Sequence, residues 1–435
     1  MRDWWDGCDY GDEVRRLALL LLVPLLASAP HPPSAAQVPA EASAAAPSPV
    51  VASARKDPVR LIADAHWDFG EDWRTGTKDG VRIRKGELVL AAPKLSRNLR
   101  GTRYDVGQWT SAWTSPGFGL TELIASWEAT TPRNSWVEIR VRGRAGSTTS
   151  SWDILGRWAA GDRKVRRTSV AGQGDDLADV AVDTWRVADP AGVSSYQLQV
   201  RLMRRAGAAY TPSVDAAHVV ASRLPDGVPA VSKPGAAAGI TLDVPKYSQM
   251  MHTGHSPEYG GGGEAWCSPT STSMVLGYYD ALPAASAYKW VGAGHTDPWV
   301  DQAARATYDA DYEGTGNWPF NTAFAATLTD RAFVTRLESL RGAEKYVAAG
   351  IPVVVSVSFK KGELDGAPIS STAGHLLVVV GFTEDGDVVV NDPASRSRSG
   401  VRRVYDRAQL EAAWLGGSGG TAYVIHDDAH PVPGG

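Results

Sequence analysis

Residues 259–279 read YGGGGEAWCSPTSTSMVLGYY and place one cysteine, Cys267, between a glycine run and the start of a predicted helix. The glycines at 260–263 allow the backbone to bend sharply and to pass close to another group. The Ser-Pro-Thr that follows Cys267 suits the first turn of a helix, where the missing N–H of proline costs nothing. A thiol at a helix N-terminus lies at the positive end of the helix dipole, which favours the nucleophilic thiolate. We therefore predict that Cys267 is a catalytic nucleophile.

The composition restricts the class of protein. The chain has 435 residues, which is more than one ordinary domain, and 43% of them are hydrophobic, so most of the chain can bury a core. The formal net charge of −4 argues against a nucleic-acid partner, because proteins that bind nucleic acids are usually basic.

Residues 1–29 are predicted to be a signal peptide. A pair of arginines at 15–16 is followed by the apolar run 17–26 and by Ala-Ser-Ala, the order of a basic region, a hydrophobic region and a cleavage site. The run is too short to span a bilayer, so we expect a secreted or extracytoplasmic protein without stable membrane insertion. The acidic residues and tryptophans before the arginines are unusual there, which indicates a translation start nearer Val14. Cleavage would remove Cys8 and leave Cys267 as the single thiol, which is then either buried and inert or reactive.

Residues 30–57 are rich in Pro, Ala and Ser and are predicted to be a linker.

Residues 58–224 have a different character. The segments 136–142 (WVEIRVR) and 196–202 (YQLQVRL) alternate apolar and polar residues, and 81–90 and 120–127 are further candidate strands. Short strands separated by turn residues, with no long helix among them, predict an all-β sandwich or jelly roll.

Tryptophan is concentrated in this predicted sandwich. Aromatic-rich sandwiches often bind sugars by stacking, which implies a cell-wall or glycan ligand, but large aromatic side chains are more often part of the core. Trp136 is the exception to follow, because it lies on the polar face of its strand. Nine of the 16 tryptophans fall in the region: Trp67, Trp73, Trp109, Trp113, Trp127, Trp136, Trp152, Trp158 and Trp185.

A second linker is predicted at residues 225–241, followed by a second domain at 242–428. Helices followed by an antiparallel sheet predict an α+β fold for this domain. The expected hairpin has a tight two-residue turn at Asp385-Gly386. The pattern predicts helices at 297–308 and 336–349 after the Cys267 helix, strands at 353–359, 375–382 and 388–391, and closing elements at Trp414 and 421–425.

His375 and Asp392 are the candidate partners of Cys267. His375 heads an apolar strand, where a histidine either caps the core or is functional. Asp392 ends the return strand in an Asn-Asp-Pro sequence, which is also an ordinary turn. With the tight turn, Asp392 would lie about 13 Å along the strand from His375, so a bulge, a twist or a longer loop has to bring them together.

The chemistry of thiol catalysis assigns a role to each residue. Cys267 would attack a carbonyl, His375 would protonate the leaving group, and Asp392 or its neighbour Asn391 would fix the imidazole tautomer. The oxyanion needs donors, for which the backbone N–H of Cys267 and the side chain of Gln249 are candidates. On its own Gln249 is equally consistent with a surface amide.

Four motifs taken together resemble a known family. VPKYSQ (244–249), WCSPTSTSMVLGYY (266–279), GHLLVVVGF (374–382) and VVVNDPAS (388–395) are similar to the papain-superfamily peptidases of cysteine peptidase family thirty-nine, which process bacteriocin leaders. The chain resembles in particular the secreted bacterial branch of this family, over residues 242–427.

This resemblance implies a papain-like fold and a cysteine peptidase acting on a peptide or protein, without a cofactor. It carries the family's Gln, Cys, His and Asp roles onto Gln249, Cys267, His375 and Asp392. Ser268 stands where many members have Gly, and the insertion at 250–263 is long. No transporter or nucleotide-binding segment follows, so the bacteriocin-exporter role does not carry over.

Two further motifs have alternative interpretations. His252 and His255 would ligate a metal with Glu258 or Glu264, but they lack the helical HExxH framework, so no metal is expected. The loop 314–320 (GTGNWPF) is not a phosphate loop, because no Lys-Ser/Thr follows it. It is better interpreted as an aromatic wall or lid which, with Trp266, sets substrate preference.

Three functions remain open on the sequence. The first is an exported cysteine hydrolase, specifically a peptidase that forms a thioester acyl-enzyme. The second is an acyltransferase or cell-wall amidase with the same triad. The third is a catalytically inactive binding protein that acts through its tryptophan-rich sandwich. The first predicts alkylation of Cys267 well below the pH at which a free thiol reacts, whereas the third predicts no reaction with electrophiles.

Overall fold

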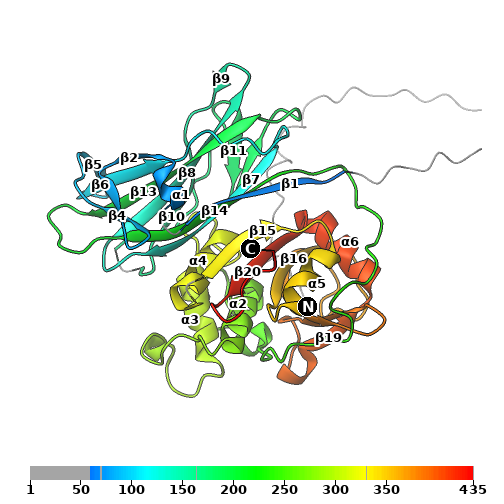
Figure 1. The fold of residues 1–435 in the computed structure, drawn as a ribbon. Helices are drawn as coiled ribbons and strands as arrows, with labels where there is room; N and C mark the ends of the chain where they lie inside the picture. Colours follow the sequence, from blue (N-terminus) through cyan, green and yellow to red (C-terminus); the bar gives the residue numbers. More distant parts are fainter. Residues whose placement is uncertain (1–58, 69–70, 163, 330, 435) are drawn as a thin grey trace, which may run out of the picture. The chain divides into compact units, whose positions relative to one another are not determined.

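A computed structural model describes residues 59–68, 71–162, 164–329 and 331–434 (Figure 1). The predicted signal peptide (1–29) and the first predicted linker (30–57) lie outside these residues. Among the helices of the described residues, none combines the length and the apolar character that crossing a membrane requires.

The sandwich region, residues 61–223, contains two antiparallel sheets packed face to face, which confirms the predicted all-β sandwich. Within the described residues the first sheet has the order β11-β12-β7-β14-β4-β3, with β1 also paired to β14. The second has the order β10-β8-β13-β6-β2, with β5 paired to β6 and β9 to β8. The first sheet comprises β1 (Leu61–Trp67), β3 (Val81–Arg84), β4 (Glu87–Leu90), β7 (Glu122–Thr130), β11 (Ala178–Ala181), β12 (Thr184–Val187) and β14 (Ser213–Arg223). The second comprises β2 (Thr77–Asp79), β5 (Leu95–Leu99), β6 (Thr102–Thr110), β8 (Trp136–Ala145), β9 (Thr148–Thr149), β10 (Asp153–Trp158) and β13 (Ser195–Arg205), and the short helix α1 is Glu71–Arg74.

The alternating segments form the facing surfaces of the two sheets. Val137, Ile139 and Val141 of β8 point into the core between the sheets, as their period of two predicts. The predicted strand at 81–90 is instead the hairpin β3–β4, because Lys85 adopts a left-handed φ of 53° and Gly86 one of 88°. A positive φ is a turn conformation, which glycine adopts at no steric cost.

Most tryptophans of the sandwich are core residues. Seven of the nine are less than 9% exposed, and Trp113 and Trp152 are only partly buried. Trp136, which the alternation places on the polar face of its strand, is fully buried on the outer face of the second sheet, in a small cluster with Tyr104 and Met203. The outer face of this sheet therefore carries an apolar cluster that the alternation alone does not reveal.

The helix–sheet region, residues 242–426, has one antiparallel sheet, with the order β15-β20-β16-β17-β18-β19 among the described residues. Its strands are β15 (Arg331–Arg336), β16 (Val353–Phe359), β17 (Thr372–Phe382), β18 (Val388–Asn391), β19 (Arg402–Tyr405) and β20 (Thr421–His426). Its α-helices are α2 (Cys267–Tyr278), α3 (Pro298–Thr307), α4 (Trp318–Thr329), α5 (Leu340–Ala348) and α6 (Arg407–Ser418). Short 3-10 helices are η1 (Gln249–His252), η2 (Gly263–Ala265), η3 (Lys289–Val291) and η4 (Arg398–Gly400).

Helices cover both faces of this sheet. Apolar side chains of α2, α3 and α4 pack on one face and those of α5 and α6 on the other. Figure 1 shows these two groups of helices on opposite sides of the strands. Alternate residues of β17 divide between the two layers, with Leu376 and Val378 on the α2 side and Leu377 and Val379 on the other. A strand buried on both faces gives the continuous apolar run that the sequence shows there.

Several element boundaries differ from the prediction. The predicted helix at 336–349 contains the end of β15 and starts only at Leu340. The predicted lid loop at 314–320 leads directly into α4, whose first residues are Trp318 and Pro319; proline is favourable in a first helical turn. The other predicted helix and the strands at 353–359 and 388–391 are found at or within one residue of their predicted bounds.

The segment 225–241, predicted to be a linker, is attached to the sheet rather than free. Ala237 is fully buried, and the backbone of residues 239–242 exchanges hydrogen bonds of 2.8–3.0 Å with Val380 and Phe382 at the end of β17. These bonds satisfy backbone groups of β17 beyond Val379, where its pairing with β16 ends.

The sandwich region contacts the edge of the third sheet directly. The backbone N–H groups of Ala332 and Val334 on β15 donate to side-chain oxygens of Glu128 and Ser126, each at 3.0 Å. An edge strand exposes unpaired N–H groups, and here side chains of β7 satisfy two of them. The two regions accordingly belong to one compact unit.

Candidate active site

The glycine run before α2 adopts a backbone conformation that other residues rarely adopt. The φ angles of Gly260, Gly261 and Gly262 are 74°, 95° and 109°. At Gly263 a Cβ would lie 2.1 Å from the carbonyl oxygen of His252, so a side chain has no room there. The run therefore both turns the chain and allows the close approach that the sequence predicts.

Cys267 is the first residue of α2 and is 4% exposed. The N–H groups in the first turn of a helix have no partner within the helix, and the dipole is positive there. The hydroxyl of Ser271 donates to the carbonyl oxygen of Leu376 at 3.1 Å. Because Leu376 directly follows His375 on β17, this bond holds the cysteine end of α2 beside the histidine.

His375 and Asp392 form a buried pair. They are 3% and 1% exposed, and Nε2 of His375 lies 2.8 Å from Oδ1 of Asp392. The side chain of Cys267 hydrogen-bonds to the same imidazole, and because Nε2 is engaged by Asp392, Nδ1 is the nitrogen that remains for the thiol. The structure thus places the imidazole between the thiol and the carboxylate, which is the arrangement that nucleophilic catalysis requires.

The hairpin that joins His375 to Asp392 differs from the predicted tight turn. Five residues, 383–387, connect the strands, and a β-bulge interrupts their pairing. The strand partner of Asn391 is therefore Val378, which places Asp392 opposite position 377, two residues from His375. Such diagonal neighbours lie about 7–8 Å apart at the backbone, which long side chains bridge.

Electrostatics favour the charged forms of both partners. Burial acts against a charged imidazole, but the Asp392 carboxylate and the hydrogen bonds to Asp392 and Cys267 outweigh it and raise the pKa of His375 to about 10. Burial likewise acts against a charged Asp392, but the charge of His375 and hydrogen bonds, including one from Tyr405, lower the pKa of Asp392. At neutral pH the pair is therefore imidazolium and carboxylate.

Tyr405 on β19 is a part of the site that the sequence analysis missed. Its hydroxyl donates to Oδ2 of Asp392 at 2.7 Å, and the ring is fully buried. Burial, followed by the nearby Asp392 carboxylate, raises the pKa of Tyr405, so the phenol stays a donor. The signal for Tyr405 is only its place on the strand after β18, because β19 pairs with β18 in the sheet.

Gln249 is buried, at 3% exposure, and is the first residue of η1. Its backbone N–H donates to the carbonyl oxygen of Pro393 at 2.9 Å, beside Asp392. Its side-chain Nε2 donates to the carbonyl oxygen of Glu264, three residues before the cysteine. An amide nitrogen carries two hydrogens, so one remains for another acceptor.

Asn391, the alternative to Asp392 as the orienting group, has other contacts. Its Nδ2 donates to the carbonyl oxygens of Val244 at 3.2 Å and Pro245 at 3.0 Å. These residues lead to Gln249, so Asn391 supports the glutamine segment, whereas Asp392 contacts the imidazole.

Cys267 lines a cavity of about 590 Å³ to which both regions contribute. Gly374, next to the histidine, and Ser418 line it from the helix–sheet region, and Thr184 lines it from the sandwich. Trp318 and Gly316 of the predicted lid segment also line it, whereas Trp266 is fully buried and donates to the carbonyl oxygen of Tyr259 at 2.7 Å. The predicted aromatic wall thus includes Trp318, whereas Trp266, expected to act with it in substrate preference, is not among the described residues that line the cavity.

Charged groups in the cavity lining are mainly basic. The charged groups among its described lining residues are three guanidinium groups, of Arg60, Arg186 and Arg336, and one carboxylate, of Glu122. Glu122 pairs with Arg336 at 2.6 Å and with Arg186 at 3.6 Å, which leaves an excess of positive charge.

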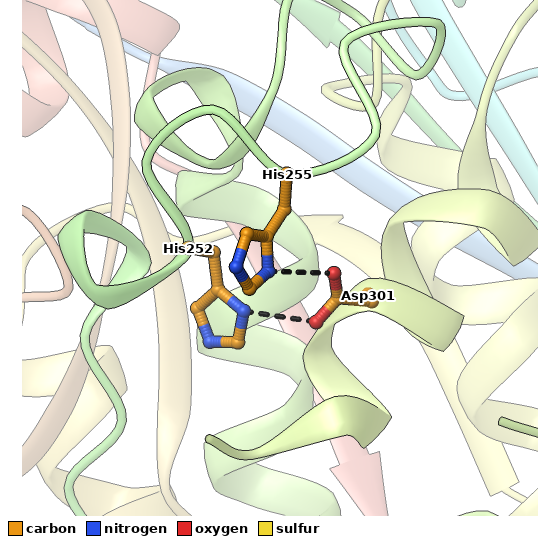
Figure 2. A group of neighbouring side chains, drawn as sticks. All are labelled: His252, His255 and Asp301. Atoms are coloured by element: carbon orange, nitrogen blue, oxygen red, sulfur yellow. Dashed lines mark hydrogen bonds and ion pairs between the residues drawn. The ribbon is translucent and has the colours of Figure 1, made fainter. Parts of the chain in front are cut away.

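The histidines of the 250–263 insertion do not meet Glu258 or Glu264. Both His252 and His255 contact the carboxylate of Asp301 on α3 (Figure 2). The sequence gives no indication of this partner, because Asp301 is an ordinary polar position in an amphipathic helix.

Comparisons with known proteins give two family matches. Residues 63–222 match the Peptidase C39 N-terminal domain, and residues 241–421 match the Peptidase_C39 like family. The search of curated proteins finds no match. One solved structure, described as the structural basis for the promiscuous specificity of carbohydrate-binding modules from the β-sandwich super family, is 10% identical with a TM-score of 0.17. The match covers 36% of this chain and 55% of that one.

Proposed function

The chain belongs to the C39-like cysteine peptidases, and from this premise we propose that it is an exported peptidase in which Cys267, His375 and Asp392 form a catalytic triad. The observation that carries the proposal is the imidazole of His375, which contacts the Cys267 thiol and lies 2.8 Å from Asp392 beside a cavity. Triads are recognised by such geometry rather than by sequence position.

The proposed reaction has two stages. The Cys267 thiolate attacks the carbonyl carbon of a peptide bond, and the resulting oxyanion accepts hydrogen bonds from the first turn of α2 and from Gln249. Collapse breaks the C–N bond, the His375 imidazolium protonates the departing amine, and a thioester remains. Water then attacks the thioester while neutral His375 takes its proton, which releases the acid and restores the thiolate–imidazolium pair.

A peptide library tests this proposal. The wild type is expected to cleave a subset of peptides, and Cys267→Ala and His375→Ala are expected to cleave none. Absence of cleavage by the wild type would overturn the peptidase assignment, and unchanged cleavage by the variants would overturn the residue assignment. Products joined to an added amine, in place of hydrolysis, would indicate the alternative acyl-transfer reaction with the same triad.

Export is the part of the proposal that rests on sequence alone. The arginine pair and the apolar run before Ala29 support cleavage by a signal peptidase. N-terminal sequencing of the protein from the medium or cell envelope is expected to begin near residue 30. Retention of residues 1–29 in a protein confined to the cytoplasm would contradict it.

Tyr405→Phe is expected to lower kcat about 10-fold while changing KM little. The phenol acts through Asp392 and does not line the cavity. A hydrogen bond to a charged group is worth about 1.5–3 kcal/mol, which corresponds to about 10–150-fold if the whole of it is lost in the transition state. The measurement is a Michaelis–Menten comparison on one cleaved peptide, with Tyr104→Phe in the sandwich as the matched control. An unchanged kcat, or an effect confined to KM, would contradict the orienting role.

The positive charge of the cavity predicts a preference for acidic peptides. Peptides carrying Asp or Glu near the scissile bond are expected to have kcat/KM values about 3–10-fold above those of matched Gln peptides at low salt, and salt should reduce the ratio. Arg186→Gln is expected to reduce the ratio, because the side chain of Arg186 is 56% exposed, whereas Arg60 is partly buried and Arg336 is buried. Arg84→Gln, on the exposed edge hairpin, is the control. Equal rates for acidic and neutral peptides would contradict this preference.

A glycan ligand of the sandwich remains a separate proposal. Trp113 and Trp152, the two partly buried tryptophans, support it, although the guanidinium of Arg142 stacks on both rings at 5.3 and 4.5 Å. This proposal predicts that the wild-type protein is retained on insoluble cell-wall material and that Trp113→Ala and Trp152→Ala each reduce the retention. Equal retention of wild type and both variants would contradict it.

A further inference from the structure

The insertion between Gln249 and Cys267 builds a cluster of metal-ligand side chains. Nδ1 of His252 lies 2.9 Å from Oδ2 of Asp301, and Nδ1 of His255 lies 3.1 Å from Oδ1 of the same carboxylate. Figure 2 shows both rings directed at Asp301 from one loop, opposite helix α3. One donor atom from each of the three residues falls within 4.8 Å of the others.

The charge of Asp301 is not balanced by a fixed cation. Asp301 is 1% exposed, and its hydrogen-bond and ion-pair partners among the described residues are the two imidazoles. Asp297, four residues earlier, is also buried but is paired by Arg398 at 2.8 Å. A buried carboxylate requires a paired cation or a bound metal, so the contrast between the two aspartates points to a cation at Asp301.

His252 presents a metal-binding nitrogen to this carboxylate. The ring is fully buried, and Nδ1 is the nitrogen that lies against Asp301. A neutral imidazole that ligates through Nδ1 brings no charge of its own, so a divalent ion held between the ring and Asp301 would balance the carboxylate.

The distances suit a small divalent ion with nitrogen ligands. Zinc binds His nitrogen and carboxylate oxygen at about 2.0–2.2 Å in tetrahedral geometry, which separates the ligands by about 3.3 Å. The third histidine, His295, places Nδ1 3.1 Å from Nε2 of His255 and so can fix the orientation of that ring, as outer partners of metal ligands do. Two imidazoles and a carboxylate favour zinc, cobalt or nickel over calcium or magnesium.

We propose that His252, His255 and Asp301 bind one divalent ion of the zinc type, with water as a fourth ligand. The ion would join the insertion to α3. His252 ends η1, which begins with Gln249, and its ring lies 6.0 Å from that of Trp266, the residue before Cys267. None of the three ligands lines the cavity that contains Cys267, so the ion acts on the position of the loop.

The test measures zinc bound per chain by equilibrium dialysis and elemental analysis. It uses a Cys267→Ala background, because Cys267 and His375 would themselves bind zinc. One tightly bound zinc per chain is expected, and Asp301→Asn and His255→Ala are each expected to weaken binding at least 10-fold. Asp297→Asn is the matched control, because it removes a similarly buried carboxylate from the start of the same helix and should keep the zinc.

Two further measurements keep the test decisive if one variant folds poorly. Cobalt at the site should give the intense visible bands of a tetrahedral complex, and these bands should be lost in His255→Ala. The His255 side chain is 23% exposed, so its removal should disturb the fold less than removal of a fully buried ligand. Zinc should raise the melting temperature by about 5 °C in the Cys267→Ala protein and not in Asp301→Asn. The proposal is overturned if Asp301→Asn and His255→Ala still bind one zinc per chain. It is also overturned if the Cys267→Ala parent binds no more zinc than these two variants. These outcomes do not depend on peptidase activity.

Discussion

Cys267→Ala is expected to lower kcat/KM for any cleaved peptide by about 10⁴-fold or more. The thiolate is the atom that forms the acyl-enzyme, and removing a covalent nucleophile from a triad leaves only the contributions of binding and of the oxyanion donors. The measurement is the rate of product formation under single-turnover conditions, where a missing acyl-enzyme cannot be hidden by slow product release.

The matched control is Cys267→Ser, which keeps the size and a hydroxyl donor to His375 but loses the acidity of the thiol. It is expected to remain nearly as inactive as the alanine variant, with a cooperative unfolding transition like that of the wild type. Residual activity within about 10-fold of the wild type in either variant would assign the reaction to another nucleophile.

His375→Gln is expected to have the second largest effect, a loss of about 10³-fold in kcat together with a loss of stability. The variant removes the proton donor for the leaving amine and also the partner of a buried carboxylate. Breaking a buried ion pair from one side costs about 3–5 kcal/mol, because the remaining charge is uncompensated. Chemical denaturation measures the second effect separately from the kinetics.

The double variant His375→Gln/Asp392→Asn is the control that separates the two effects. It removes both charges, so most of the stability is expected to return while activity stays absent. A double variant as unstable as the single one would mean that packing, rather than the charge pair, dominates the site.

The pH dependence of stability follows from the same pair. The pKa of His375 is raised to about 10, so its stabilisation is complete below its ordinary pKa of about 6.5 and is lost as the pH rises toward 10. The pKa of Asp392 is lowered, so its stabilisation is present above about 3.9 and is lost as the pH falls below it. The difference in unfolding free energy between the wild type and the double variant should therefore be largest between about pH 4 and 6.5.

The sequence was sufficient to predict the helix start at Cys267 and the elements with strong periodicity. Cys267 could be placed at a helix start because glycine, serine and proline have conformational meanings that do not depend on distant contacts. β16 and β18 could be placed because continuous apolar runs bounded by turn residues specify buried strands. The fold class followed from the order of these elements.

The contacts that complete the site depend on register, which the sequence does not specify. A five-residue loop and a bulge, rather than a two-residue turn, decide that Asp392 reaches His375. Tyr405 becomes part of the site only because β19 pairs with β18, and Asp301 meets the insertion only because α3 packs beside it. Such long-range pairings are set by tertiary packing, which local patterns do not encode.

The most direct test of the triad is the rate at which Cys267 is alkylated by a small neutral haloacetamide as a function of pH. Mass spectrometry of the Cys267 peptide measures the rate in the wild type and in His375→Gln. The imidazolium of His375 and the N-terminus of α2 should hold the sulfur as a thiolate, so the wild-type rate should already be near its plateau at about pH 6. The variant should need a pH near that of a free thiol, about 8.5. A wild-type rate that rises only near pH 8.5, together with an unchanged profile in His375→Gln, would contradict the assignment of Cys267 as an activated nucleophile.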